Sequence, residues 1–406
     1  MASQRVMNFG AGPSALPTAV LEKATEGLFN FAGTGIGIAE ISHRSTQFRA
    51  YIAKVADSIR TELQVPSTHQ ILFMQGGGTG QFATVVLNML ARHRLLYPDL
   101  PEEERTLDYC VTGQWSKKAM EEAQRLGGAK VNVAVNGKEH SADGKSFDSI
   151  PPHDTFKFSA NPALIYYCEN ETVDGVQYSH ESDSPASFPF HLLKQDTLLP
   201  LVADYSSSFM SRPINRIADH AIVFAGAQKN LGPAGLTVVI VRQDCIVDVD
   251  AAAKLGAMPV PIIMAYKTIC EFDSLYNTPS VLAIYVAGLV LDRMKEKGGI
   301  KFYEAGNKRK SEKLYAALQE GVDKGVIKAR VKEGSRSWMN ITFDVLTEGG
   351  EARYLEGGIK RGMKGMDGHR SVGGIRVSLY NAITEEETDK LVEYIKEFVA
   401  AESAAK

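Results

Sequence analysis

The sequence contains few of the features that place a protein in a specialised class. Its four cysteines lie far apart and form no C-x-x-C pair, so they predict neither a zinc site, nor a redox dithiol, nor a disulfide framework. We interpret all four as buried, reduced thiols of a cytosolic protein, and we predict no metal site. No apolar run approaches the roughly 18 residues that cross a membrane, so no membrane span is predicted.

The chain also lacks a strong charge of either sign. It has 45 basic and 48 acidic residues, a formal net charge of −3, and therefore no electrostatic signature of nucleic acid or anionic membrane as a partner. The first residues, MASQRVMNFGAGPSALP, contain no apolar core of a secretory signal. Internal repeats and low-complexity stretches are absent as well. These absences predict a globular, cytoplasmic protein.

Short apolar runs alternate with helical patterns through the first two thirds of the chain. Runs that are apolar throughout are typical of strands buried on both faces, and their alternation with helices predicts a mostly parallel α/β sheet. The last of these runs follows the preceding one closely and could be its antiparallel neighbour. The predicted strands lie at 71–74, 107–112, 163–168, 199–203, 220–224 and 236–241, and the predicted helices at 81–90 and 116–126.

The pattern becomes richer in helix after residue 280. Two long helical patterns occupy 281–297 and 300–321, and they are followed by the segment SWMNITFD at 337–344, a helix before Gly362 and a strand at 374–380. Thr384 with Glu387 three residues later forms the signature of a capping box, which predicts the start of the final helix. We therefore predict three parts: an N-terminal segment (1–16) near the active site, a large domain (17–280) and a small C-terminal α/β domain (281–406).

A lysine and an aspartate stand at the ends of two predicted strands. Lys229 follows the strand at 220–224, and Asp204 comes directly after the strand at 199–203. Desolvation of a lysine lowers its pKa and frees the amine for Schiff-base formation, whereas a lone lysine is usually a solvated loop residue. Asp204 could equally be a turn cap. Together, an acid for a pyridinium nitrogen and a Schiff-base lysine indicate pyridoxal 5′-phosphate.

A glycine-rich stretch, QGGGTGQF at 75–82, lies between a predicted strand and a predicted helix. Glycines let backbone N–H groups approach an anion, and the helix N-terminus adds its dipole, so the stretch predicts a phosphate cradle. It is neither a Walker A loop nor G-x-G-x-x-G. Trp115 could stack on a flat heterocycle or be a core residue. Thr172 could donate a hydrogen bond to the phenolate oxygen of the cofactor or stand in a strand-end turn.

Several longer segments occur in the order of one known family. They are NFGAGPSALP at 8–17, SHR at 42–44, QGGGTGQF at 75–82, NETVDGV at 170–176, VADYSS at 202–207, FAGAQKNLGPAG at 224–235, SLYNTPS at 274–280 and GHRSVGGIRVSLYNA at 368–382. With these segments the chain resembles the phosphoserine aminotransferase family, from residue 8 to the final helix. This family belongs to the fold-type-I, class V pyridoxal-phosphate aminotransferases.

The resemblance implies a fold and a reaction. The fold is a large domain with a mostly parallel seven-stranded sheet between helices and a smaller C-terminal α/β domain. The reaction transfers an amino group between L-glutamate and 3-phosphohydroxypyruvate, which gives O-phospho-L-serine and 2-oxoglutarate in L-serine biosynthesis. Ping-pong kinetics are expected, because one cofactor passes the amino group between two substrates. A homodimer with shared active sites is also implied.

The resemblance also implies roles for individual residues. Lys229 matches the Schiff-base lysine, Asp204 the pyridinium partner, Trp115 the stacking ring and Thr172 the phenolate donor. Contacts to the cofactor phosphate are matched by Gly78, Thr79 and Gln228, and by Asn277 and Thr278 from the second subunit. Arg376 matches the residue that binds the α-carboxylate. The cluster for the distal anion is matched by His43, Arg44, His369 and Arg370.

One position departs from the family pattern. Bacterial members commonly have arginine where this chain has Thr79, so a cationic side chain is missing there and the backbone N–H groups must hold the phosphate. The sequence also leaves rival functions open. A cysteine desulfurase is disfavoured because Gln228 stands where its histidine would be, and an alanine–glyoxylate aminotransferase has less need of Gly368–Arg370 (GHR). A non-enzymatic phosphate-binding protein would leave Asp204 and Lys229 unexplained.

Overall fold

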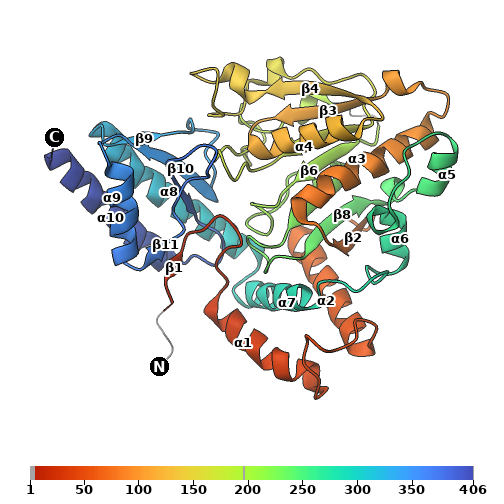
Figure 1. The fold of residues 1–406 in the computed structure, drawn as a ribbon, viewed down its shortest axis with the longest axis horizontal. Helices are drawn as coiled ribbons and strands as arrows, with labels where there is room; N and C mark the ends of the chain where they lie inside the picture. Colours follow the sequence, from red (N-terminus) through yellow and green to blue (C-terminus); the bar gives the residue numbers. More distant parts are fainter. Residues whose placement is uncertain (1–4, 195–196, 406) are drawn as a thin grey trace.

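A seven-stranded sheet forms the centre of the larger part of the molecule (Figure 1). The computed structural model describes residues 5–194 and 197–405. The strands are β2 (His69–Met74), β3 (Thr106–Val111), β4 (Lys130–Asn136), β5 (Leu164–Cys168), β6 (Leu201–Asp204), β7 (His220–Gly226) and β8 (Thr237–Arg242). Their order across the sheet is β2-β8-β7-β6-β5-β3-β4. The predicted α/β fold with a mostly parallel sheet is thereby confirmed.

The strand directions follow the sequence pattern. Strands β7, β6, β5, β3 and β4 pair in parallel, and β8 pairs antiparallel with both β7 and β2. The antiparallel neighbour expected at 236–241 is therefore confirmed. Strand β4 was not predicted, because it lies at the sheet edge with a half-exposed face, and its alternating sequence KVNVAVN contains no continuous apolar run.

Helices cover the sheet and, in the view of Figure 1, extend below it. Those of the larger part are α1 (Thr18–Phe29), α2 (Thr46–Leu63), α3 (Gly77–Leu96), α4 (Gln114–Leu126), α5 (Val249–Lys254), α6 (Tyr266–Glu271) and α7 (Val281–Glu296). The helix expected at 81–90 begins four residues earlier, so the glycine-rich stretch itself forms the first turn of α3. Glycine is a poor helix former, which hid this turn from a prediction by propensity.

A smaller unit packs beside the large sheet around a second hydrophobic core. Its sheet has the order β12-β10-β9 and is antiparallel. Its elements are α8 (Ile300–Asp323), β9 (Ile327–Ala329), β10 (Asn340–Val345), α9 (Gly350–Lys360), β11 (Met363–Lys364), β12 (Ile375–Ser378) and α10 (Glu385–Ala404). The N-terminal strand β1 (Met7–Asn8) pairs with β11, and Phe9 is buried in this second core.

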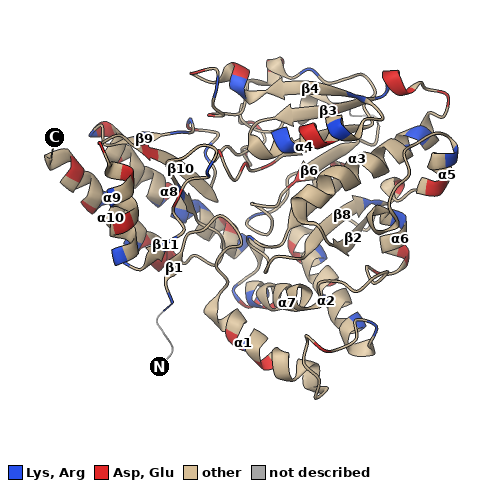
Figure 2. Cartoon of the chain, in the orientation of Figure 1, with Lys and Arg blue, Asp and Glu red and all other residues tan. Residues whose placement is uncertain are grey.

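Helix α7 packs on α1 and α2, and its buried side chains belong to the larger core. The three-part division at residues 17 and 281 stays a prediction. No helix among the described residues is long and apolar enough to cross a membrane. The same residues contain no group of three or more His, Cys, Asp or Glu side chains that could hold a metal ion. Figure 2 shows that basic and acidic residues are interspersed over the chain.

The parallel strands bring separate chain segments to one edge of the sheet. The carboxyl ends of β3, β5, β6 and β7 lie side by side, since these strands are neighbours with the same direction. The residues that follow these ends include Trp115, Thr172 and Lys229, and Asp204 is the last residue of β6. Ligands of open α/β sheets bind at this edge.

The final helix is capped as the sequence predicts. Thr384 Oγ1 accepts from the Glu387 N–H at 3.1 Å, and Glu387 Oε2 accepts from the Thr384 N–H at 2.8 Å. We expect Thr384→Ala to destabilise the first turn of α10 by about 1 kcal/mol. Hydrogen exchange of a peptide covering 384–390 should then accelerate about fivefold. Glu393→Ala, an exposed change in the same helix, should alter that exchange by less than about twofold; equal effects would contradict the capping role.

Candidate active site

Lys229 lies in the turn after β7 and is buried, with 8% of its surface exposed. Its Nζ donates a hydrogen bond to Thr172 Oγ1 at 2.7 Å, and no salt bridge holds it among the residues described. Burial lowers the pKa of Lys229, an effect that the nearby Asp204 carboxylate opposes. A desolvated amine with a lowered pKa is the form in which lysine acts as a nucleophile.

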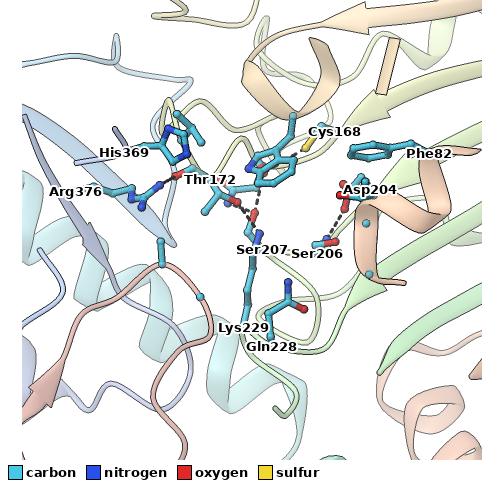
Figure 3. Close-up of a pocket in the computed structure, with 18 of the residues that line it drawn as sticks. Phe82, Cys168, Thr172, Asp204, Ser206, Ser207, Gln228, Lys229, His369 and Arg376 are labelled. Atoms are coloured by element: carbon cyan, nitrogen blue, oxygen red, sulfur yellow. Dashed lines mark hydrogen bonds between the residues drawn. The ribbon is translucent and has the colours of Figure 1, made fainter. Parts of the chain in front are cut away.

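Asp204 ends β6 on the other side of the cavity from Arg376 (Figure 3). The Ser206 N–H donates to its Oδ1 at 2.8 Å, and burial raises the pKa of the carboxyl group. Its second oxygen, Oδ2, lies 3.8 Å from the point where a Cβ on Gly78 would stand. Asp204 therefore faces the first turn of α3 and has an oxygen available for a cationic ring N–H.

The first turn of α3 is built from the glycine-rich stretch. Gly76, with φ 97°, is the N-cap, and no side chain caps the helix and no acidic residue lies in its first turn. The Gly77 N–H donates to Thr237 Oγ1 at 2.9 Å on the neighbouring strand β8. Gly78 and Thr79 follow with backbone N–H groups that a helix start leaves without intrahelical partners. The turn therefore suits an anion, as the sequence predicts.

Trp115 and Thr172 form a wall of the cavity and are held together by one carboxylate. Buried Glu171 accepts from the Trp115 N–H at 2.8 Å and from the Ser116 N–H at 2.9 Å, so it caps α4. Burial and the nearby Asp174 raise the pKa of Glu171. The indole Nε1 of Trp115 is buried without a hydrogen-bond partner. A polar group of this kind requires a ligand atom or water to satisfy it.

Arg376 reaches the cavity from β12 of the smaller unit. Its Nη1 donates to the carbonyl oxygen of Thr172 at 3.3 Å, and its Nε is buried without a partner. Burial lowers the pKa of this guanidinium, and among the described residues no carboxylate forms a salt bridge with it. A partly desolvated cation without a counterion is costly, so the site is complementary to an anionic ligand.

One cavity of about 440 Å³ collects these groups. Figure 3 shows Lys229 rising between two ends, with Arg376 and His369 at one and Asp204 at the other. The predicted residues that line it are Gly78, Thr79, Trp115, Thr172, Asp204, Gln228, Lys229, His369 and Arg376. A planar phosphorylated aldehyde fits this set: the amine lies in the middle, and the carboxylate and helix N-terminus lie at one end.

Comparison with known proteins agrees with this geometry. The family model for class-V aminotransferases matches residues 6–391. A phosphoserine aminotransferase of Ectopseudomonas mendocina is 38% identical over 98% of each chain, and a probable phosphoserine aminotransferase of Caenorhabditis elegans is 40% identical over 97% of each. The chain belongs to the phosphoserine aminotransferase family. It is therefore an aminotransferase of class V.

Solved structures of the phosphoserine aminotransferase family have the same fold. The phosphoserine aminotransferase from Bacillus circulans subsp. alkalophilus is 33% identical, with a TM-score of 0.85 over 98% of this chain and 99% of that one. The pyridoxal-phosphate-bound enzyme from Trichomonas vaginalis is 34% identical, with a TM-score of 0.81 over 97% and 100%. An alanine–glyoxylate aminotransferase from Nostoc, at 16% identity and a TM-score of 0.68, shares the fold alone.

The remaining predicted residues lie outside the cavity of their own chain. Thr278 is exposed, and its carbonyl oxygen accepts from Gln75 Nε2 at 2.9 Å. Asn277 donates to Gln75 Oε1 at 3.2 Å, so both residues lie beside the glycine-rich turn but not within the site. The other predicted residues that do not line the cavity are His43, Arg44 and Arg370. The roles of all five stay predictions.

Sequence reasoning missed several cavity residues. Cys168, which was expected to be a buried thiol, is buried at the cavity wall, and burial raises its pKa well above the usual value. Ser206 accepts from the Gly226 N–H at 3.0 Å and so joins the ends of β6 and β7. In the sequence, Ser206 only follows Asp204, for which a turn cap was the alternative interpretation. Only the parallel pairing of β6 with β7 places Ser206 in the site.

Gly78 provides a direct test of the cradle. A Cβ at this position would meet its neighbours at 3.8–4.0 Å, which is ordinary contact, so Gly78→Ala should fold normally. The methyl group would nevertheless fill space in the cavity, and overpacking of this kind should weaken pyridoxal-phosphate binding about tenfold or more. Titration of the apoenzyme, followed by absorbance, measures the change.

Gly80→Ala is the matched control for this variant. Gly80 lies two residues further along α3, does not line the cavity, and has room for a Cβ at 3.5 Å from the Gln75 carbonyl oxygen. We expect it to bind the cofactor as the unmodified protein does. Equal affinity of the two variants would mean that the first turn of α3 does not contact the cofactor.

Proposed function

We propose that the protein is a phosphoserine aminotransferase that moves the amino group between L-glutamate and 3-phosphohydroxypyruvate. The products are 2-oxoglutarate and O-phospho-L-serine, the latter an intermediate of L-serine biosynthesis. Membership of the family supports this function. The observation that carries it is the meeting of the Lys229 amine, the Asp204 carboxylate and the Arg376 guanidinium, whose Nε is buried without a partner, around one cavity.

The cofactor of this reaction is pyridoxal 5′-phosphate. When bound, its aldehyde accepts the amino group and its ring draws electrons from the substrate Cα. Lys229 would bind it covalently, and Asp204 would keep the proton on the ring nitrogen. Trp115 would stack on the ring and Thr172 would donate to its phenolate oxygen. The backbone of Gly78 and Thr79 holds the phosphate with Gln228, so the arginine of bacterial relatives at position 79 is not required.

The electrostatics of the site suit the proton transfers. Burial lowers the pKa of Lys229, which favours the neutral amine that takes the proton from the substrate Cα and returns it. The Thr172 hydroxyl holds the Lys229 Nζ at 2.7 Å near the centre of the cavity. Asp204 is a buried carboxylate without a salt bridge among the residues described, and a protonated ring nitrogen supplies the missing partner.

Both substrates carry two anionic groups. Arg376 binds the shared α-carboxylate through the bidentate geometry that an arginine allows. The second anion, phosphate or γ-carboxylate, is bound by a distal anion-binding cluster, which we define as His43, Arg44, His369 and Arg370. His369 lines the cavity, whereas Arg44 does not. The cluster is therefore completed by a second chain, which also supplies Asn277 and Thr278.

The other functions fit the site less well. The thiols of all four cysteines have a pKa that burial raises, so none is the mobile thiolate of a cysteine desulfurase. The likeness to an alanine–glyoxylate aminotransferase is one of fold. A non-enzymatic phosphate-binding protein would not need the buried amine of Lys229. We place the enzyme in the cytoplasm, with two substrates and a second copy of the chain as its partners.

An absorbance spectrum tests the reaction and the role of Lys229 together. L-Glutamate should convert the visible band of the bound cofactor to the aminated form, and 3-phosphohydroxypyruvate should restore it, because the two half-reactions share one cofactor. In Lys229→Ala neither conversion should occur, and borohydride reduction should leave no cofactor mass on the denatured chain. A restored band in this variant, or failure of 3-phosphohydroxypyruvate to restore it in the unmodified enzyme, contradicts the proposal.

Mixed dimers test the shared site. A Lys229→Ala chain lacks the amine but retains Asn277 and Thr278, and an Asn277→Ala/Thr278→Ala chain has the reverse defect. If the phosphate contacts cross the interface, a random mixture regains about a quarter of the normal sites, since half of the dimers are mixed and each has one complete site. A mixture with an excess of one parent chain is the control, because it forms fewer mixed dimers and should regain fewer sites. No recovery after mixing would show that each chain builds its site alone.

A further inference from the structure

We propose that Arg330, paired with Asp344, is a positioning residue for substrate binding in the smaller unit. It holds the turn 369–373, which carries His369 and Arg370, in the conformation that presents these two side chains to the distal anion of the substrate. This inference deepens the proposed function and rests on it. Arg330 itself does not line the active-site cavity, so it acts through the turn.

The guanidinium of Arg330 contacts the turn directly. Arg330 follows β9, and its Nη1 donates to the Gly373 carbonyl oxygen at 3.0 Å, while its Nη2 donates to the Val372 carbonyl oxygen at 3.1 Å. On its other side, Nε donates to Asp344 Oδ1 on β10 at 2.9 Å. One planar group therefore joins an acidic residue of the sheet to two consecutive carbonyls of the turn. Charge-assisted bonds of this kind are the strong ones in proteins.

The backbone of the turn is shaped around this contact. Gly373 and Gly374 have φ values of 63° and 71°, a region that favours glycine. A Cβ on Gly374 would stand 2.3 Å from Arg330 Nη2, so any larger residue would displace the guanidinium. The glycine pair is therefore required both for the chain direction and for the close approach of Arg330.

The turn has few other anchors at its tip. The Val372 and Gly373 N–H groups donate to the His369 carbonyl oxygen at 2.9 and 2.8 Å, which closes the turn on itself. His369 Nδ1 and Ser371 Oγ are 2.6 Å apart. These bonds are internal to the turn, and Arg370 and Ser371 are exposed. Among the residues that the structure describes, the Arg330 side chain ties Val372 and Gly373 to the sheet, in addition to the bonds at the stem of the turn.

The stem connects the turn to the residue that binds the α-carboxylate. The Gly368 N–H donates to the Gly374 carbonyl oxygen at 2.8 Å, and the Arg376 N–H donates to the Met366 carbonyl oxygen at 2.9 Å. Strand pairing thus fixes Arg376 at the base of the turn, whereas the positions of His369 and Arg370 depend on the conformation of the tip. Loss of Arg330 should therefore affect recognition of the distal anion and leave the α-carboxylate contact in place.

A pair of amino donors separates these two effects. O-Phospho-L-serine carries the distal phosphate, and L-serine is the same molecule without it. In single-turnover reactions followed by the cofactor absorbance, Arg330→Met should lower kcat/KM for O-phospho-L-serine by between about tenfold and a hundredfold, mainly through KM. The rate with L-serine should remain unchanged. Asp344→Asn should produce a smaller change in the same direction.

Lys328→Met is the matched control for charge. Lys328 is exposed on β9 and lines the same surface cavity as Arg330, but it makes none of the contacts to the turn. The Lys328→Met substitution therefore removes one positive charge from the same region as Arg330→Met. If it weakens the reaction with O-phospho-L-serine as much as Arg330→Met does, the effect is one of overall charge, and the positioning role is wrong.

Hydrogen exchange provides a readout that does not depend on activity. In Arg330→Met, a peptide that covers 367–374 should exchange faster, whereas one that covers α10 should not. Unchanged exchange in the turn, or an equal loss with O-phospho-L-serine and L-serine, overturns the positioning role. If the unmodified enzyme itself does not convert O-phospho-L-serine, the proposed function fails. The exchange measurement then still decides whether Arg330 holds the turn.

Discussion

Burial of charge without a counterion is the constraint on which the active site depends. Lys229, Asp204 and Arg376 surround one cavity, and no salt bridge among the described residues neutralises any of them. Burial raises the pKa of Asp204 and lowers the pKa of Lys229 and of Arg376, so it disfavours the charged form of each group. Such groups are costly in a folded protein, and a ligand that supplies a cationic ring, an aldehyde carbon and a carboxylate removes the cost at all three positions. The unliganded fold is thus complementary to a ligand of this kind.

A buried polar network at this site joins the two units of the molecule and fixes their relative position. Asn170, after β5, donates to Ser207 Oγ at 2.7 Å and to Asn340 Oδ1 at 2.8 Å, and Asn340 in turn donates to Tyr380 Oη at 3.1 Å. Tyr380 Oη donates to the carbonyl oxygen of Ala11 at 2.8 Å. A buried network of this kind is stabilising only when every member has its partners, so it fixes one relative position of the strand ends, β10 and the N-terminal segment. This position places Arg376 at the cavity that Lys229 and Asp204 also line.

Particular elements show how far sequence reasoning extends. The buried strands were found because apolar runs bounded by turns have few other interpretations, and Thr384 was found because a capping box is a local signal. Strand β4 was missed because edge strands keep a polar face, and the start of α3 was placed too late because helix propensity penalises glycine. Cys168 was set aside because no local pattern distinguishes a thiol in the core from one at a cavity wall.

The sequence by itself determined the chemistry: an amine, a carboxylate and a glycine-rich turn at strand ends, in segments whose order resembles one aminotransferase family. These features are local, and their residue types restrict the reaction whatever the details of packing. Only the tertiary structure decided which of them share a cavity. Nine predicted residues line it, whereas Asn277 and Arg44 do not, because strand order and the docking of the smaller unit set distances that no local pattern encodes. The contact of Arg330 with the turn at 369–373 was also decided by the tertiary structure, since some forty residues separate the two along the chain.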